Sequence, residues 1–152
     1  MIRFLVPLLA LVLFAGCGAT KPDPTAKPLT HGRLVYLADR ACAADLRNGR
    51  ALPPVTNPAS FVKRVRGAIK SGEQLLSVLN GLTPPPSDAK VYRRLLAAEN
   101  RSDSVATHVL ANYGSYVTLR AFKHDVRRLK RLGRRVKASA RNLGMHVCAK
   151  DN

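Results

Sequence analysis

The chain has 152 residues and a formal net charge of +17, because 26 lysine and arginine residues outweigh 9 aspartate and glutamate residues. This length favours one modest domain over several, and the hydrophobic fraction of 46% is enough for a core. The charge imbalance predicts attraction to anionic surfaces.

The first sixteen residues have the pattern of a secretory signal. Arg3 supplies a positive charge, an apolar run extends from Phe4 to Phe14, and the small pair Ala15-Gly16 follows. The apolar run is shorter than the roughly 20 residues that span a hydrocarbon core. We therefore interpret residues 1–16 as a signal peptide and not as a permanent membrane helix.

The segment Phe14-Ala15-Gly16-Cys17 resembles a bacterial lipobox, in which the cysteine sulfur receives a diacylglycerol. This resemblance implies that the mature chain begins at the lipidated Cys17. It also implies an extracytoplasmic location, with the protein anchored to the cell membrane. The alternative is an ordinary signal peptide followed by a chance cysteine. Removal of Arg3 with the signal leaves a charge of +16 on the mature chain.

Residues 17–29 have the composition of a tether. Prolines occupy positions 22, 24 and 28, and no apolar period appears. Such a segment favours extended chain of about 3.1 Å per residue. We expect it to hold the folded domain, residues 30–152, away from the bilayer.

The cysteine count indicates one disulfide. Once Cys17 is lipidated, only Cys42 and Cys148 remain. An exported protein most simply oxidises such a pair to a disulfide. The alternative is two free, buried thiols.

Hydrophobic spacing predicts four helices in residues 30–152. The first runs from Thr30 to about Asn48. The second has Asn57 as N-cap and Pro58 at its first position, and ends at Asn80-Gly81. The third is capped by Ser87 and ends at Tyr113-Gly114, and the fourth runs from near Tyr116 to Gly144.

Each of the last three helices has one face of apolar or small residues that step by three and four positions. The predicted faces are Phe61, Val65, Ala68, Gly72, Leu75, Leu79 and Leu82; then Val91, Leu95, Ala98, Ser102, Val105, Val109 and Asn112; then Leu119, Phe122, Val126, Leu129, Gly133, Val136, Ala140 and Leu143. No stretch alternates with period two. The prediction is an all-α domain, an antiparallel four-helix bundle with short connections.

Three short motifs resemble a group of small exported helical proteins and lipoproteins of high-GC Gram-positive bacteria that have no assigned activity. The motifs are Tyr36-Leu37-Ala38-Asp39-Arg40-Ala41-Cys42, Leu79-x-x-Leu82-x-Pro84 and Ala140-x-x-Leu143-Gly144-x-x-x-Cys148. The resemblance covers most of the mature chain and implies a helical fold and cysteine pairing, but no chemistry. In that group an aspartate commonly follows a glycine before the last helix, whereas here Ser115 follows Gly114.

The sequence predicts no enzyme. The closest acids, Glu99 and Asp103, are one helical turn apart but lie off the apolar face, so we interpret them as surface charges. No HExxH motif, histidine pair, phosphate-binding loop or nucleophile elbow is present, so we expect no catalytic residue, metal site or cofactor. We interpret the histidines, His31, His108, His124 and His146, as surface or satisfied core residues.

The last helix carries a row of cations three or four residues apart. Its members are Arg120, Lys123, Arg127, Lys130, Arg134, Lys137 and Arg141. Like charges at this spacing destabilise a helix by roughly 0.2 to 0.5 kcal/mol per pair. The row is therefore either a solvated face, partly offset by Glu99 or Asp103 of the neighbouring helix, or a site that binds an anion.

Two functions fit these features. The first is a lipid-anchored, non-catalytic envelope protein whose basic face binds anionic lipid, anionic wall polymer or an acidic protein. The alternative is a surface protein that binds nucleic acid, which should carry aromatic residues among the basic ones for base stacking. Phe122 lies on the predicted buried face, no tryptophan is present, and Tyr113 and Tyr116 only flank the helix start. We therefore rank envelope binding first.

Overall fold

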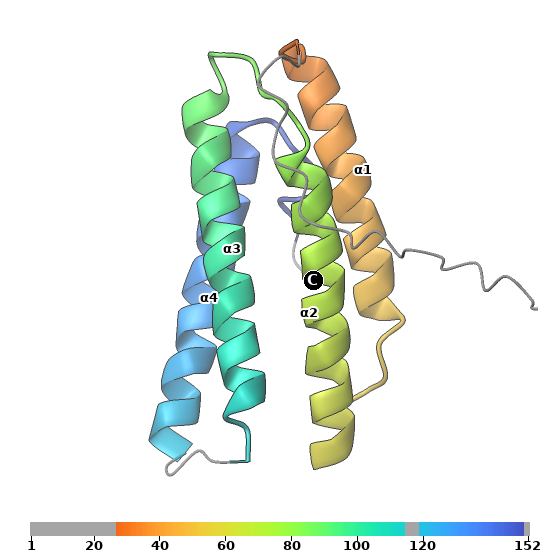
Figure 1. Ribbon diagram of the computed structural model, residues 1–152, viewed down its shortest axis with the longest axis vertical. Helices are drawn as coiled ribbons and strands as arrows, with labels where there is room; N and C mark the ends of the chain where they lie inside the picture. The colour runs from red at the N-terminus through yellow and green to blue at the C-terminus, as the bar shows by residue number, and fades with distance from the viewer. Residues whose placement is uncertain (1–26, 115–118, 151–152) are drawn as a thin grey trace, which may run out of the picture.

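The computed structural model of the protein describes residues 27–114 and 119–150 (Figure 1). The predicted signal peptide, Cys17 and residues 18–26 of the predicted tether lie outside the described residues, as does the predicted helix start near Tyr116. Within the described ranges, no helix is long and apolar enough to cross a membrane.

Four helices make up the fold, and the described residues contain no strand. They are α1 (His31–Arg50), α2 (Pro58–Asn80), α3 (Ala89–Ala111) and α4 (Leu119–Asn142). Consecutive helices run in opposite directions along the long axis (Figure 1). Each helix packs against the next one in the chain: α1 against α2, α2 against α3, and α3 against α4. The all-α, four-helix prediction is confirmed.

On one side of the bundle the helix backbones do not approach one another closely. No Cα atom of α4 comes within 8 Å of a Cα atom of α1 or α2 in the described residues. The interior between these helices is therefore filled only where side chains are long enough to reach across.

Helices α1 and α2 begin where the sequence predicts, directly after Thr30 and Asn57. The Thr30 side chain accepts a hydrogen bond from the Arg33 backbone N–H at 3.3 Å. In α2, the Asn57 side chain accepts from the Ser60 N–H at 2.9 Å, and the Ser60 hydroxyl oxygen accepts from the Asn57 N–H at 2.9 Å. This capping box satisfies backbone donors that a helix leaves unpaired.

The predicted cap of α3 is wrong. Asp88, not Ser87, occupies the N-cap position, and no side chain caps the helix there. The N–H groups of Asp88 and Ala89 both donate to the Pro85 carbonyl, at 3.0 and 3.1 Å, so the turn after the prolines leads directly into the helix. The Asp88 carboxylate instead lies 2.7 Å from Nδ1 of His31 and joins the starts of α1 and α3.

The main core lies at the end of the bundle where α1 begins and α4 ends. It is formed by Leu34, Ala38, Cys42, Leu75, Leu79, Tyr92, Leu95, Ala140, Leu143 and Met145. Tyr92 is only 1% exposed, and its hydroxyl donates to the Leu79 carbonyl at 2.7 Å. The Leu79 carbonyl, in the last turn of α2, also accepts from the Leu82 N–H at 3.1 Å, so it has two hydrogen-bond donors. The sequence pattern did not identify Tyr92 as a core residue.

The chain leaves α4 by a sharp turn that returns it to α1. Gly144 has a positive φ of 71°, a conformation that glycine adopts without the steric cost of a side chain. The Met145 N–H donates to the Ala140 carbonyl at 2.9 Å, which is the hydrogen bond of a Schellman-type helix end. Met145 is 1% exposed, so the turn inserts its side chain into the core.

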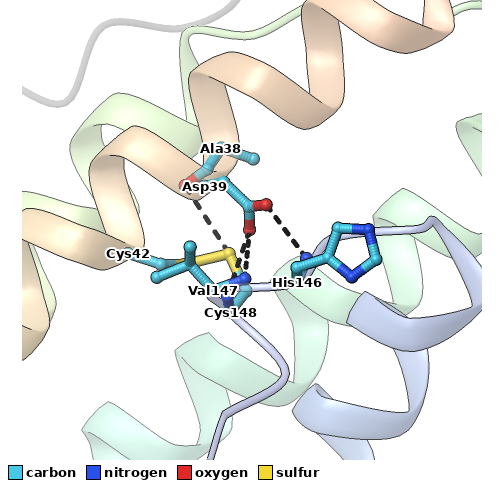
Figure 2. The surroundings of a disulfide bond; sticks show 6 residues. All are labelled: Ala38, Asp39, Cys42, His146, Val147 and Cys148. Carbon is cyan, nitrogen blue, oxygen red and sulfur yellow. Dashed lines mark hydrogen bonds between the residues drawn. A yellow bond between two sulfur atoms is a disulfide. The ribbon is translucent and has the colours of Figure 1, made fainter.

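Asp39 holds the segment that follows this turn (Figure 2). Its carboxylate accepts hydrogen bonds from three consecutive backbone N–H groups: His146 at 2.9 Å, Val147 at 2.8 Å and Cys148 at 3.2 Å. Cys42, one helical turn after Asp39, forms a disulfide with Cys148, with 5.2 Å between their Cα atoms. The predicted cysteine pair is confirmed. The segment after α4 is therefore attached to α1 both by hydrogen bonds to the Asp39 carboxylate and by the disulfide.

We expect Asp39→Ala to lower the free energy of unfolding by at least about 2 kcal/mol, because it leaves three backbone donors without their charged acceptor. Urea denaturation of the oxidised protein measures this loss. Glu73→Ala, which removes an exposed carboxylate from α2, should change stability by no more than about 0.5 kcal/mol. Equal effects of the two substitutions would contradict a specific role for Asp39.

Candidate functional site

A groove of about 620 Å³ opens along the side of the bundle where the backbone of α4 does not closely approach that of α1 or α2. All four helices and the C-terminal segment contribute to its lining. Its volume lies within the roughly 300 to 1,000 Å³ typical of ligand pockets.

Small residues on three facing helices create this space. Ala68 and Gly72 of α2, Ser102 and Ala106 of α3, and Gly133 of α4 all line the groove. The prediction that Ala68 is buried is wrong, because no opposing side chain covers it and it is exposed to the groove. A side-chain carbon added at Gly133 would meet no atom within 4 Å. The interior is therefore underfilled at the middle of the bundle.

Three acids line the groove: Asp45 of α1, and Glu99 and Asp103 of α3. The interpretation of Glu99 and Asp103 as surface charges is wrong, since both are partly buried and belong to this lining. The Ser71 hydroxyl donates to Oδ1 of Asp45 at 2.6 Å. Oδ1 of Asp103 lies close to Gly72, 3.5 Å from where a Cβ on this glycine would stand, which is an ordinary van der Waals distance.

Burial and nearby carboxylates raise the pKa values of Glu99 and Asp103. Burial, followed by the charges of Asp45 and Asp103, raises the pKa of Glu99 from 4.5 to about 7. Burial, followed by the charge of Glu73, also raises the pKa of Asp103. A carboxyl group whose pKa is shifted by burial and by charged neighbours in a cleft marks a candidate functional site.

The groove also has basic lining residues. These are Arg50, Arg64, Lys137 and Lys150. Nη1 of Arg64 donates to the carbonyls of Leu52 and Pro53, at 3.1 and 3.0 Å, so this guanidinium group is held against the loop between α1 and α2. In the described residues, no group of three or more His, Cys, Asp or Glu side chains could hold a metal ion. The arrangement suits exchange of a proton at Glu99 or contact with an organic cation.

The predicted basic row lies along the side of α4 that faces solvent, except at one position. Six of its seven members are exposed: Arg120, Lys123, Arg127, Lys130, Arg134 and Arg141. Lys137, four residues after Gly133, is partly buried and lines the groove. Arg128, Arg131 and Arg135 are also exposed on α4. We call the six exposed row residues the basic face.

The basic face is not neutralised by acids of the neighbouring helix. Glu99 and Asp103 line the groove instead, and among the residues that the structure describes no lysine or arginine of the basic face forms a salt bridge. Asp125, the acid of α4, lies 3.7 Å from Nε2 of His108 and 3.3 Å from Nδ1 of His124. The positive charge of this face is therefore directed to solvent.

Aromatic rings near the start of α4 are used for packing. The Phe61 and Tyr113 rings stack with centroids 4.5 Å apart, and Phe122 meets both edge-on. These contacts join the start of α2, the end of α3 and the start of α4. Tyr113 and Phe122 are both partly buried in this cluster.

No protein-family model, curated protein or solved structure matches this chain. No activity is therefore transferred to this chain from a relative.

The basic row was predicted from the sequence, but the groove was not. One signal was available: Gly72, Ser102 and Gly133 are small residues on three predicted inner faces. Glu99 gave no such signal, because it lies next to Ala98 at the edge of the apolar face of α3. Only the packing of α3 against α2 and α4 decides that this carboxyl group lies in the groove.

The raised pKa of Glu99 predicts a pH-dependent stability. Since the pKa in the folded state, about 7, exceeds the ordinary value of 4.5, the folded chain binds this proton more tightly than the unfolded chain. The resulting stabilisation is fully present below about pH 4.5 and is lost as the pH rises through about 7. Glu99→Gln cannot ionise, so at about pH 8 it should be more stable than the wild type, by up to about 3 kcal/mol.

Urea unfolding at about pH 5 and about pH 8 checks this prediction. The advantage of Glu99→Gln should largely disappear at the lower pH, where the wild-type carboxyl group is mostly protonated in the folded state. Glu73→Gln, on the exposed side of α2, serves as the control for loss of one negative charge. If Glu99→Gln changed the stability by the same amount at both pH values, the pKa of the Glu99 carboxyl group would not be raised in the folded state.

Proposed function

We propose that this protein is a lipid-anchored, non-catalytic protein of the cell envelope whose basic face on α4 binds anionic surfaces. The observation that carries the proposal is the row of exposed cations without salt bridges among the described residues. The lipobox-like segment that ends at Cys17 supports export and attachment. The resemblance to small exported lipoproteins of high-GC Gram-positive bacteria supports the same location.

The geometry of the face suits an extended anionic surface. At 1.5 Å rise per residue, the distance from Arg120 to Arg141 along α4 is about 30 Å. Anionic lipid contributes about 1 kcal/mol for each lysine or arginine close to the membrane surface. Several simultaneous contacts would therefore add to the attachment that a lipid at Cys17 provides.

Nucleic acid is the less favoured ligand. Proteins that bind single strands stack bases on exposed aromatic rings set among basic residues. Here Tyr113 stacks on Phe61 and Phe122 packs against both, so these rings already have partners inside the bundle. The positive charge could attract a phosphate backbone, but these residues provide no stacking platform beside it.

Binding of the basic face to anionic lipid should depend on charge and salt. We expect residues 17–152, unlipidated and carrying Cys17→Ser, to bind phosphatidylglycerol vesicles and to ignore phosphatidylcholine vesicles. Because the Debye length is about 10 Å at 0.1 M salt, binding should weaken steeply as salt is added. Changing Arg127, Lys130 and Arg134 to glutamate should abolish it, as measured by vesicle co-sedimentation.

The matched control reverses three exposed charges on another helix. Arg93, Arg94 and Arg101 of α3, changed together to glutamate, alter the net charge by the same amount. This variant should retain most vesicle binding. Equal loss in both variants would mean that net charge alone acts, and tighter binding to DNA or heparin than to the vesicles would favour a different anion.

Attachment to the membrane should require Cys17. In cells, Cys17→Ala should release the protein from the membrane fraction or leave it unprocessed, because two or more acyl chains are what make anchoring stable. Fractionation and gel mobility measure both outcomes. An unchanged membrane fraction together with unchanged mobility would refute lipidation at this residue.

A further inference from the structure

We propose that the groove is a binding site for an organic amine with an apolar body. The ammonium group would lie against the carboxylates of Asp45, Glu99 and Asp103, and the apolar body against the hydrophobic lining. This site is distinct from the basic face, which lies on the solvent side of α4, and it would take a ligand of opposite charge.

The lining supplies hydrophobic contact on several sides. Leu46 comes from α1, Val65 and Ile69 from α2, and Leu129 and Val136 from α4. A ligand that covers these side chains gains roughly 25 cal/mol for each Å² of apolar surface removed from water. Pockets of this kind, apolar with a few convergent polar groups, are the usual form of small-molecule sites.

The polar groups of the groove favour a cation at its centre. Glu99 and Asp103 form no salt bridge within the described residues, and Asp45 accepts only a neutral hydroxyl, that of Ser71. The charges that shift the pKa of Glu99 are those of Asp45 and Asp103, and both raise it. The charges that act most strongly on Glu99 are therefore negative, although the whole chain carries +17.

Charged groups from every surrounding element line the groove. Asp45 and Arg50 come from α1, Arg64 from α2, Asp103 and Glu99 from α3, Lys137 from α4 and Lys150 from the C-terminal segment. Glu73 of α2 acts on Asp103. A bound ammonium group stabilises the ionised form of Glu99, so binding should release a proton and strengthen as the pH rises from about 6 to about 8.

Three probes with the same alkyl chain separate charge from hydrophobic contact. Octylamine, octanol and octanoate are each titrated into residues 17–152 carrying Cys17→Ser, and the dissociation constants are measured by calorimetry. We expect octylamine to bind at least about tenfold more tightly than octanol, as hydrogen bonds to charged groups allow. Octanoate should bind more weakly than either.

Two substitutions locate the site. Glu99→Gln should weaken octylamine binding about tenfold and leave octanol binding unchanged, because it removes the charge and keeps the shape. Gly133→Leu should block all alkyl probes, since it fills open space in the groove. The leucine meets no neighbour at its Cβ, and it removes a glycine from a helix interior, so we expect this variant to fold.

A control variant tests whether octylamine occupies the groove. Asp88→Asn removes one negative charge at the start of α3, outside the groove lining, and should leave octylamine binding unchanged. Octanol binding as tight as that of octylamine would overturn the proposal in favour of a merely apolar cavity. Tighter binding of octanoate would overturn it in favour of the basic lining residues, and full octylamine affinity in Glu99→Gln or Gly133→Leu would place the ligand elsewhere.

Discussion

The hydrogen bonds from three backbone N–H groups to Asp39 are the interaction on which the arrangement of the bundle depends. α1 and α4 make no close backbone approach, so chain order alone does not fix their separation. The Gly144 turn brings the end of the chain back to α1, where the Asp39 carboxylate receives it and the Cys42–Cys148 disulfide makes the contact covalent (Figure 2). The cysteines are 106 positions apart in the sequence, and closure of so long a loop restricts the unfolded chain strongly, by up to about 4.7 kcal/mol in the entropic treatment.

The groove is a consequence of closing the bundle at its two ends but not at its middle. At one end the main core, with Leu34, Ala140 and Met145, fills the interior. At the other end the rings of Phe61, Tyr113 and Phe122 join α2, α3 and α4. Between these two clusters the inner faces carry glycine, alanine and serine, which are too short to meet across the gap. The ends can therefore hold the helices at a fixed separation while the middle stays open.

Sequence periodicity predicted the helices well because their signals are local. Asn57 with Pro58, the proline run before α3 and Gly144 act within a few residues, so the type and order of the elements followed from short-range rules. The cysteine pair followed from counting.

What could not be predicted depends on packing between distant segments. No local pattern in the sequence marked Asp39 for this role, yet it binds backbone groups more than 100 residues away. Glu99 and Asp103 looked like surface charges for the same reason, since their surroundings are set by α1, α2 and α4 and not by α3.

The distribution of charge connects the groove with the basic face. Both features use α4: its solvent side carries the basic face, while Gly133, Val136 and Lys137 line the groove. In a strongly basic chain, repulsion between cations would normally be reduced by placing acids beside them. Here Glu99 and Asp103 lie in a partly desolvated groove, where burial and the charges of nearby carboxylates hold their pKa values above the ordinary ones. The chain thus gives up two sources of electrostatic stabilisation at once, at the basic face and in the groove. Since surface pairs of this kind contribute only about 0 to 1 kcal/mol each, a disulfide-closed bundle can tolerate that loss, and both charged surfaces stay available to ligands.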